Sequence, residues 1–198
     1  MARSRWWSRS RGLPSEVYDG WRTSVPNMGG KAPTVLAWAE SENGHVVASP
    51  AVLSVSDGEH WRHVGWHEIE NGGWNGETRK LSWSRYPESV GEGSRHGSAL
   101  LTAPGRLPET FRERVAASIV VERFLPVSGE RGVVLHGRRR LAVPDEPALA
   151  AGPGEEQPVV SWHATLGRGL SWRTPGLREA VDETLAELRS EYDPGQVR

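Results

Sequence analysis

Three dipeptides that favour hairpin turns divide the middle of the chain into short runs of β-forming residues. They are Asn43-Gly44, Asp57-Gly58 and Asn75-Gly76. Asparagine, aspartate and glycine tolerate the positive φ angles that a type I′ turn needs between two antiparallel strands. The β-rich runs around these turns are 34–41, 45–49, 51–55, 60–64, 66–74, 78–85 and 97–102. Seven short antiparallel strands predict a small β-barrel or sandwich.

A helix is predicted directly after the seventh run. Pro108 and Glu109 are residue types that favour the N-terminus of a helix. The loop 86–96, which precedes the seventh run, is rich in glycine, serine and glutamate and is predicted to be flexible. The apolar stripe of the helix comprises Leu107, Phe111, Val115 and Ser118.

The last third of the chain predicts a second, smaller set of elements. The runs 118–127 and 131–141 are typical of a hairpin, and 159–166 is typical of a strand. The proline-rich segment 143–158 between them predicts a linker. Thr174 as N-cap and Pro175 as first helical residue predict a final helix. Its apolar face comprises Leu177, Val181, Leu185, Leu188 and Tyr192.

Several stretches carry a resemblance to a known family: "VLAWAES", "GHVVASPAVLSV", "VGWHEIENGGW", "GRLPETFRERVAASIVVERFLPV" and "LREAVDETLAELRSEY". They resemble an uncharacterised family of actinobacterial proteins with a pleckstrin-homology-like (PH-like) domain, and the similarity covers residues 33 to 192. The resemblance implies a fold and supplies no functional residues. Lipid-binding members of that fold hold phosphoinositides with basic residues at the first hairpin loop. Here the loop 40–44 is acidic, so phosphoinositide binding is not expected.

The sequence therefore predicts an α+β, mainly β protein. A PH-like seven-stranded antiparallel barrel capped by a helix is expected first, followed by a small extension of β-hairpin, strand and helix. The arm before the barrel shows no sustained periodicity, so residues up to about 28 are expected to be mobile and dispensable for folding. The expected divisions are the arginine- and tryptophan-rich flexible arm at 1–30, the barrel with its helix at 31–120, the extension at 121–192 and a tail at 193–198.

The histidine-rich stretch "HWRHVGWHEIENGGW" at 60–74 raises the question of a metal site. On a strand, His60 and His63 point to opposite faces, and His63 and His67 lie about 13 Å apart. One metal ion cannot bridge ligands at that separation, so no metal is expected. An unrecognised metal-dependent enzyme built around His67 and Glu68 remains a further alternative. The apolar residues expected to form the barrel wall and rim are Trp61, Trp66, Ile69 and Trp74.

No catalytic motif is recognisable. The chain has no cysteine, and no serine lies in a strand-turn-helix elbow. Ser94, His96 and Ser98 are close in sequence, but a glycine-rich mobile loop is a poor platform for catalysis. Glu68 and Glu70 would share one strand face with nothing nearby to raise a carboxyl pKa. The protein is expected not to be an enzyme and to carry no cofactor.

Two basic segments are candidate binding sites. Arg138 and Arg140 would share one strand face as a local patch, although charge that protects a sheet edge explains them as well. The segment "RSRWWSRSR" combines arginines with adjacent tryptophans, which suits an anionic membrane surface or, less well, nucleic acid. A solubilising tail, or an arm that docks on the domain, explains it better than either ligand. The residues concerned are Arg3, Arg5, Trp6, Trp7, Arg9 and Arg11.

Composition and charge favour a binding function without chemistry. The formal net charge of −1 disfavours nucleic-acid binding by the chain as a whole. No stretch of about 18 apolar residues and no signal-type apolar segment occurs, so a cytoplasmic location is expected. The predicted function is a non-catalytic protein-binding or scaffolding module. The alternative is a peripheral binder of anionic membranes or nucleic acid that acts through the N-terminal arm.

Overall fold

The computed structural model describes residues 11–25, 33–87, 94–141 and 160–192. These residues form two compact units. The first unit holds 11–25, 33–86 and 94–116, and the second holds 117–140 and 160–192. Both units combine antiparallel strands with helices, so the predicted α+β, mainly β class is confirmed.

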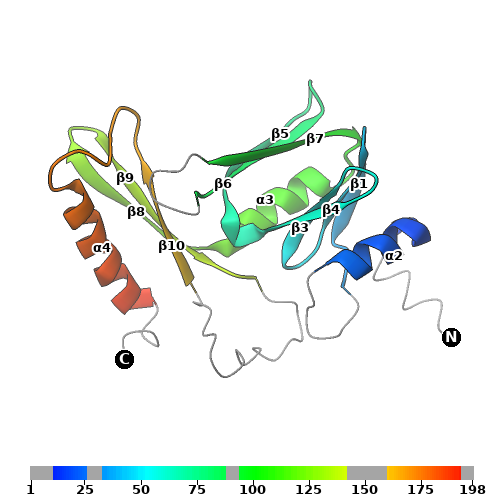
Figure 1. Cartoon of the computed structure of the whole chain (residues 1–198), viewed down its shortest axis with the longest axis horizontal. Coiled ribbons are helices and arrows are strands. Elements are labelled where there is room, and N and C mark those ends of the chain that lie inside the picture. Colours follow the sequence, from blue (N-terminus) through cyan, green and yellow to red (C-terminus); the bar gives the residue numbers. More distant parts are fainter. Residues whose placement is uncertain (1–10, 26–32, 88–93, 142–159, 193–198) are drawn as a thin grey trace. The chain divides into compact units, whose positions relative to one another are not determined.

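A seven-stranded antiparallel sheet dominates the first unit (Figure 1). Its strand order is β4-β3-β2-β1-β7-β6-β5, so β4 and β5 stand at the two ends of the order. The number of strands and their places in the sequence agree with the prediction, while closure into a PH-like barrel stays a prediction. The strands are β1 (Ala37–Ser41), β2 (Gly44–Ala48), β3 (Val52–Ser56), β4 (Trp61–Gly65), β5 (Ile69–Asn75), β6 (Lys80–Arg85) and β7 (Arg95–Ala103).

The helix α3 (Leu107–Ser118) packs on the inner face of this sheet. Leu107 and Phe111 are fully buried, as the predicted stripe requires. The Phe111 ring meets Trp66 edge to face at a centroid distance of 5.9 Å. It also lies so close to Gly72 in β5 that a Cβ there would stand 2.7 Å from the ring. Through Phe111, α3 therefore packs against the segment that follows β4 and against β5, and β4 and β5 are the two terminal strands of the sheet order.

A second helix, α2 (Ser15–Ser24), packs on the outer face of β1 to β4 (Figure 1). Tyr18 and Trp21 are buried, with relative exposures of 2% and 0%. The Tyr18 hydroxyl donates a hydrogen bond of 3.0 Å to the Pro33 carbonyl. The other members of this cluster are Leu13, Val25, Val35 and Val47, with Val17, Trp38, Val52 and Trp61 packed against it.

This helix corrects the prediction of a flexible arm at 1–30. Val17, Tyr18, Trp21 and Val25 recur at the spacing of one helix face, and burying that face stabilises α2. The pattern is short and interrupted by Gly20, which hides it in the sequence. Residues 11–25 are therefore part of the folded unit, while 1–10 and 26–30 lie outside the described residues.

The second unit is a three-stranded antiparallel sheet with α4 (Leu177–Tyr192) on one face. The strands are β8 (Ile119–Ser128), β9 (Arg131–Arg139) and β10 (Val160–Leu166), and β9 is central. The final helix begins at Leu177, two residues after the predicted start, because Gly176 has a left-handed φ of +74°. The predicted linker 143–158 lies outside the described residues. The buried core of this unit comprises Val133, Leu135, Leu177, Val181, Leu185 and Leu188.

Contrary to the predicted strand at 66–74, the histidine-rich stretch is not extended throughout. A short 3-10 helix, η1 (Trp66–Glu68), separates β4 from β5, so His67 and Glu68 do not lie on a strand. The Glu68 carboxylate accepts from the Gly65 backbone at 3.2 Å and pairs with Arg85, which holds the turn. The strand-based spacing of His63 and His67 therefore does not apply. Trp66 and Ile69 are fully buried, in agreement with their predicted place in the wall.

Candidate functional site

The strands β5, β6 and β7 present a polar outer face to solvent. Side chains on this face alternate with buried ones: Lys80, Ser82 and Ser98 are exposed, whereas Leu81 and Ala99 are buried. This alternation is typical of an antiparallel sheet with one face on the core and the other in water. The apolar residues at the alternate positions attach these strands to the inner core, and the outer positions remain available to a ligand.

The pairing register arranges the outer side chains in transverse rows. Ser84 is paired with Asn71 on β5 and with His96 on β7. The next row joins Ser82 to Gly73 and Ser98 in the same way. Because this second row contains only glycine and serine, the sheet surface is hollowed there.

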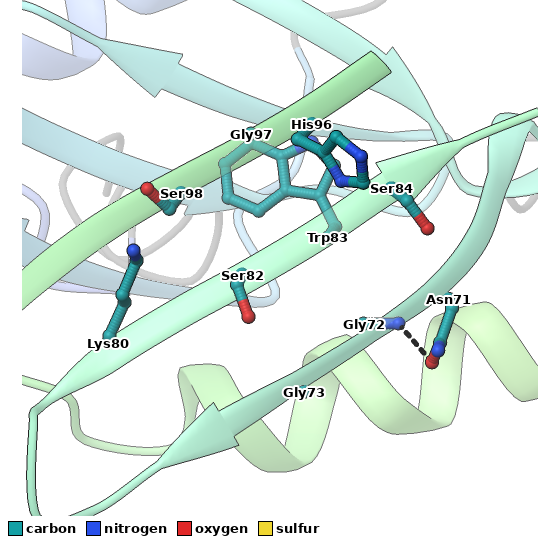
Figure 2. A pocket seen from close by; sticks show the side chains of 10 residues that line it. All are labelled: Asn71, Gly72, Gly73, Lys80, Ser82, Trp83, Ser84, His96, Gly97 and Ser98. Atoms are coloured by element: carbon teal, nitrogen blue, oxygen red, sulfur yellow. Dashed lines mark hydrogen bonds between the residues drawn. The ribbon is translucent and has the colours of Figure 1, made fainter. Parts of the chain in front are cut away.

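A groove of about 650 Å³ lies over these rows (Figure 2). Figure 2 shows Ser82 and Ser84 leaving β6 on one side and Trp83 on the other. The residues that line the groove are Asn71, Gly72, Gly73, Lys80, Ser82, Trp83, Ser84, His96, Gly97 and Ser98. Every lining residue belongs to the first unit.

The side-chain hydrogen-bond donors that line this groove have no partner within the described part of the chain. The hydroxyls of Ser82, Ser84 and Ser98 make no side-chain hydrogen bond there, and Lys80 makes no ion pair. Asn71 accepts a bond of 2.7 Å from the Gly72 backbone through Oδ1, so its amide nitrogen remains the group that can donate outward. None of the lining residues is a carboxylate. The groove is therefore donor-rich and carries one fixed positive charge.

Two close approaches make the strands beneath the groove stiff. The Trp83 indole lies directly against Gly97, so closely that a Cβ at Gly97 would overlap the ring. Trp83 is 7% exposed, so its ring serves packing rather than stacking with a ligand. Gly72 meets Phe111 of α3 in the same manner. A site on such packed strands is held more precisely than one on a loop.

The other half of the outer face carries a serine–histidine pair that sequence reasoning missed. Ser54 Oγ and His63 Nδ1 lie 2.9 Å apart on the neighbouring strands β3 and β4. Ser54 is fully buried, so its hydroxyl is not open to a substrate. Burial lowers the pKa of His63 below its usual value, which favours the neutral ring. The Asp57-Gly58 signal predicts the hairpin but not this pair, because a two-residue turn there would place residue 54 opposite residue 61. The observed loop spans four residues, 57–60, and places Ser54 opposite His63.

The structure contradicts the predicted surface patch of Arg138 and Arg140. Arg138 is 2% exposed, and its Nη1 donates to Ser118 Oγ at 3.1 Å. The reason is that β9 is the central strand, so the Arg138 side chain has neighbours on both sides. Arg140 is exposed but lies after the end of β9. The two arginines therefore do not form one exposed patch.

Of the predicted arm residues, only Arg11 is described. It lies exposed at a turn with φ of 47°, and its carbonyl accepts a hydrogen bond of 3.1 Å from Trp38 Nε1. The remaining arm residues, Arg3, Arg5, Trp6, Trp7 and Arg9, lie outside the described residues.

The predicted mobile loop with Ser94, His96 and Ser98 is also corrected. His96 and Ser98 belong to β7, because the strand pairs with β6 as far as Arg95. Ser94 Oγ donates to Glu70 Oε2 at 2.9 Å. The two glutamates of the stretch are thus used separately, Glu70 with Ser94 and Glu68 with Arg85, and they do not form a carboxylate pair.

Searches over the described ranges and against known proteins add three findings. Within these ranges, no group of three or more histidines and acidic residues is arranged to hold a metal ion. None of the helices of the described segments is long and apolar enough to cross a membrane. No protein-family model, curated protein or solved structure matches the chain.

Proposed function

We propose that the chain is a non-catalytic binding module that docks a protein partner on the outer face of β5, β6 and β7. The observation that carries this proposal is the groove of about 650 Å³, whose donors are uncommitted within the described residues. Exposed side chains with unused hydrogen-bonding capacity are groups that a partner can pair with, and a sheet presents them with little cost of ordering the backbone.

The chemistry of the groove supports binding over catalysis. A nucleophile needs a base within hydrogen-bond reach and an open approach. The hydroxyls of Ser82, Ser84 and Ser98 have no such base bonded to them in the described part of the chain, although His96 lies opposite Ser84. The bonded pair Ser54–His63 has a base but is buried. Neither half of the sheet combines both requirements.

The proposal includes a PH-like barrel as the scaffold. Seven antiparallel strands followed by a helix support it, as does the packing of Phe111 against both Trp66 and Gly72. Phe111 of α3 thereby contacts both Trp66, which lies between β4 and β5, and Gly72 of β5. We also place the module in the cytoplasm, as the sequence predicts.

The test is affinity capture with three forms of the full chain. Ser82→Trp fills the groove at its central strand, where the native residue is exposed. Thr23→Trp adds the same indole at an exposed position of α2 and serves as the matched control. A protein retained by the wild type and by Thr23→Trp, but lost with Ser82→Trp, supports the proposal. A partner retained equally by all three forms, or no specific partner at all, contradicts it.

A further inference from the structure

We infer that the groove over β5, β6 and β7 receives a carboxylate side chain, aspartate or glutamate, from the partner protein. This inference rests on the proposed function and adds the chemistry of the group recognised. Its basis is the combination of Lys80, three serine hydroxyls and the Asn71 amide in one depression without a carboxylate.

The donors face the same space because of the strand register. Lys80, Ser82 and Ser84 all lie on the outer side of β6. Each is about 7 Å along the strand from the next. Ser82 is directly opposite Ser98, and Ser84 is directly opposite His96. Side chains opposite each other on one face of an antiparallel pair have Cβ atoms about 5 Å apart. A single oxygen-bearing group over the centre of the groove can therefore reach several of these donors together.

Within the described residues, no side chain of the protein itself pairs with these donors. On α2 and β4, the exposed cations Arg22 and Arg62 are paired with Asp19 and Asp57. Lys80 has no such partner among the described residues, and neither do the three serines. The groove therefore offers one positive charge and several neutral donors to an external acceptor.

The single charge favours a carboxylate over a phosphoryl group. A carboxylate carries one negative charge and accepts through two oxygens, which matches one lysine and neighbouring hydroxyls. A phosphorylated residue carries close to two negative charges and is generally held by arginines. No arginine lines this groove.

Blocked five-residue peptides test the inference directly. Gly-Ser-Glu-Ser-Gly is compared with the same peptide containing glutamine or phosphoserine in place of glutamate, by amide chemical-shift titration of the full chain. The glutamate peptide should shift the amides of Ser82, Ser84 and Ser98 and bind about fivefold more tightly than the glutamine peptide. Raising the salt concentration should reduce this preference.

Two variants assign the preference to Lys80. Lys80→Met should make the glutamate and glutamine peptides equivalent. Arg79→Met removes the same charge from the adjacent exposed residue, which does not line the groove, and should keep the preference. Equal binding of both peptides to the wild type overturns the inference, as does tighter binding of the phosphoserine peptide.

The outcomes separate this inference from the proposed function. If Ser82→Trp abolishes partner capture while Lys80→Met leaves capture unchanged, the docking surface stands and the carboxylate inference falls. If Ser82→Trp leaves capture unchanged, the docking surface itself falls. Loss of capture with both variants, together with retention by Arg79→Met, supports both.

Discussion

The two halves of the seven-stranded sheet share a core but differ on their outer face. Over β1 to β4 this face carries Trp38, Val47 and Trp61, and α2 packs on it. Over β5 to β7 the corresponding positions are mostly small or polar, with Leu100 as an exposed apolar exception, and they are exposed or line a groove. The inner face is mainly apolar in both halves, with arginines only toward strand ends, so the difference concerns chiefly the residues that point away from the core.

This difference shows which half of the outer face is covered by a helix, and the proposed function assigns recognition to the other half. Burying an apolar outer face requires a covering element, and α2 supplies Tyr18 and Trp21 for that purpose. A face of small hydroxyl side chains gains little from being covered and keeps its hydrogen-bonding capacity in water. Variants that act on one half but not on the other therefore test the comparison.

The largest expected effect comes from opening the covered half. Trp21→Ala removes a fully buried indole from the cluster beneath α2 and should lower the free energy of unfolding by about 3–5 kcal/mol. Leu100→Ala is the control on the bare half, where the side chain is 38% exposed, and should cost less than about 1 kcal/mol. Denaturant unfolding measures both. Equal losses for the two variants would mean that α2 does not stabilise the sheet.

A smaller effect is expected beneath the groove. Gly97→Ala places a methyl group against the Trp83 ring and should cost about 1–3 kcal/mol, because the ring is packed and has to shift. Gly73→Ala on β5, on the other side of β6, is the matched control, since nothing lies within 4 Å of its Cβ position. It should change stability by less than about 1 kcal/mol. A neutral Gly97→Ala would show that the strands under the groove are not held by this contact.

The smallest effect concerns pH and His63, the half-buried histidine of the covered half. Because burial lowers the pKa of His63 in the folded state, the unfolded chain binds more protons at mildly acidic pH. The contribution of His63 to stability is therefore present above its unfolded pKa of about 6.5 and is lost as the pH falls through the lower folded pKa. The wild type should lose more stability than His63→Asn between about pH 7.5 and about pH 5. An NMR titration midpoint for His63 at or above 6.5 would refute the lowered pKa.

The sequence predicts the strands and α3 well because both follow short-range rules. The turn dipeptides mark where the three hairpins reverse, and Phe111 marks one clear helix face. The dipeptides do not fix the registers, because none is the central pair of a two-residue turn: the observed loops are 42–43, 57–60 and 76–79. The sequence predicts the outer elements poorly, because α2 is short and is stabilised mainly by packing on a sheet that is not visible in the local pattern. Arg138 is misjudged for the same reason, since its burial depends on β9 being central.

The groove could have been anticipated only in part. The hydroxyl positions on β6 are readable as outward residues of an alternating strand. To place these hydroxyls beside Gly73 and Ser98, one must know that β6 pairs with both β5 and β7. The start of β7 is also missed, because the sequence predicts a loop at 86–96. Such pairings are set by the tertiary fold rather than by local sequence.

Hydroxyl-radical footprinting of the full chain, with and without a captured partner, tests the central claim most directly. The exposed, oxidisable side chains His96 and Leu100 lie on the bare half, whereas His60 adjoins the covered half and Phe124 lies in the second unit. Docking on the outer face of β5, β6 and β7 predicts that the partner protects His96 and Leu100 from oxidation and leaves His60 and Phe124 unchanged. Protection of His60 or Phe124, with His96 and Leu100 still oxidised at the free-chain rate, would contradict it.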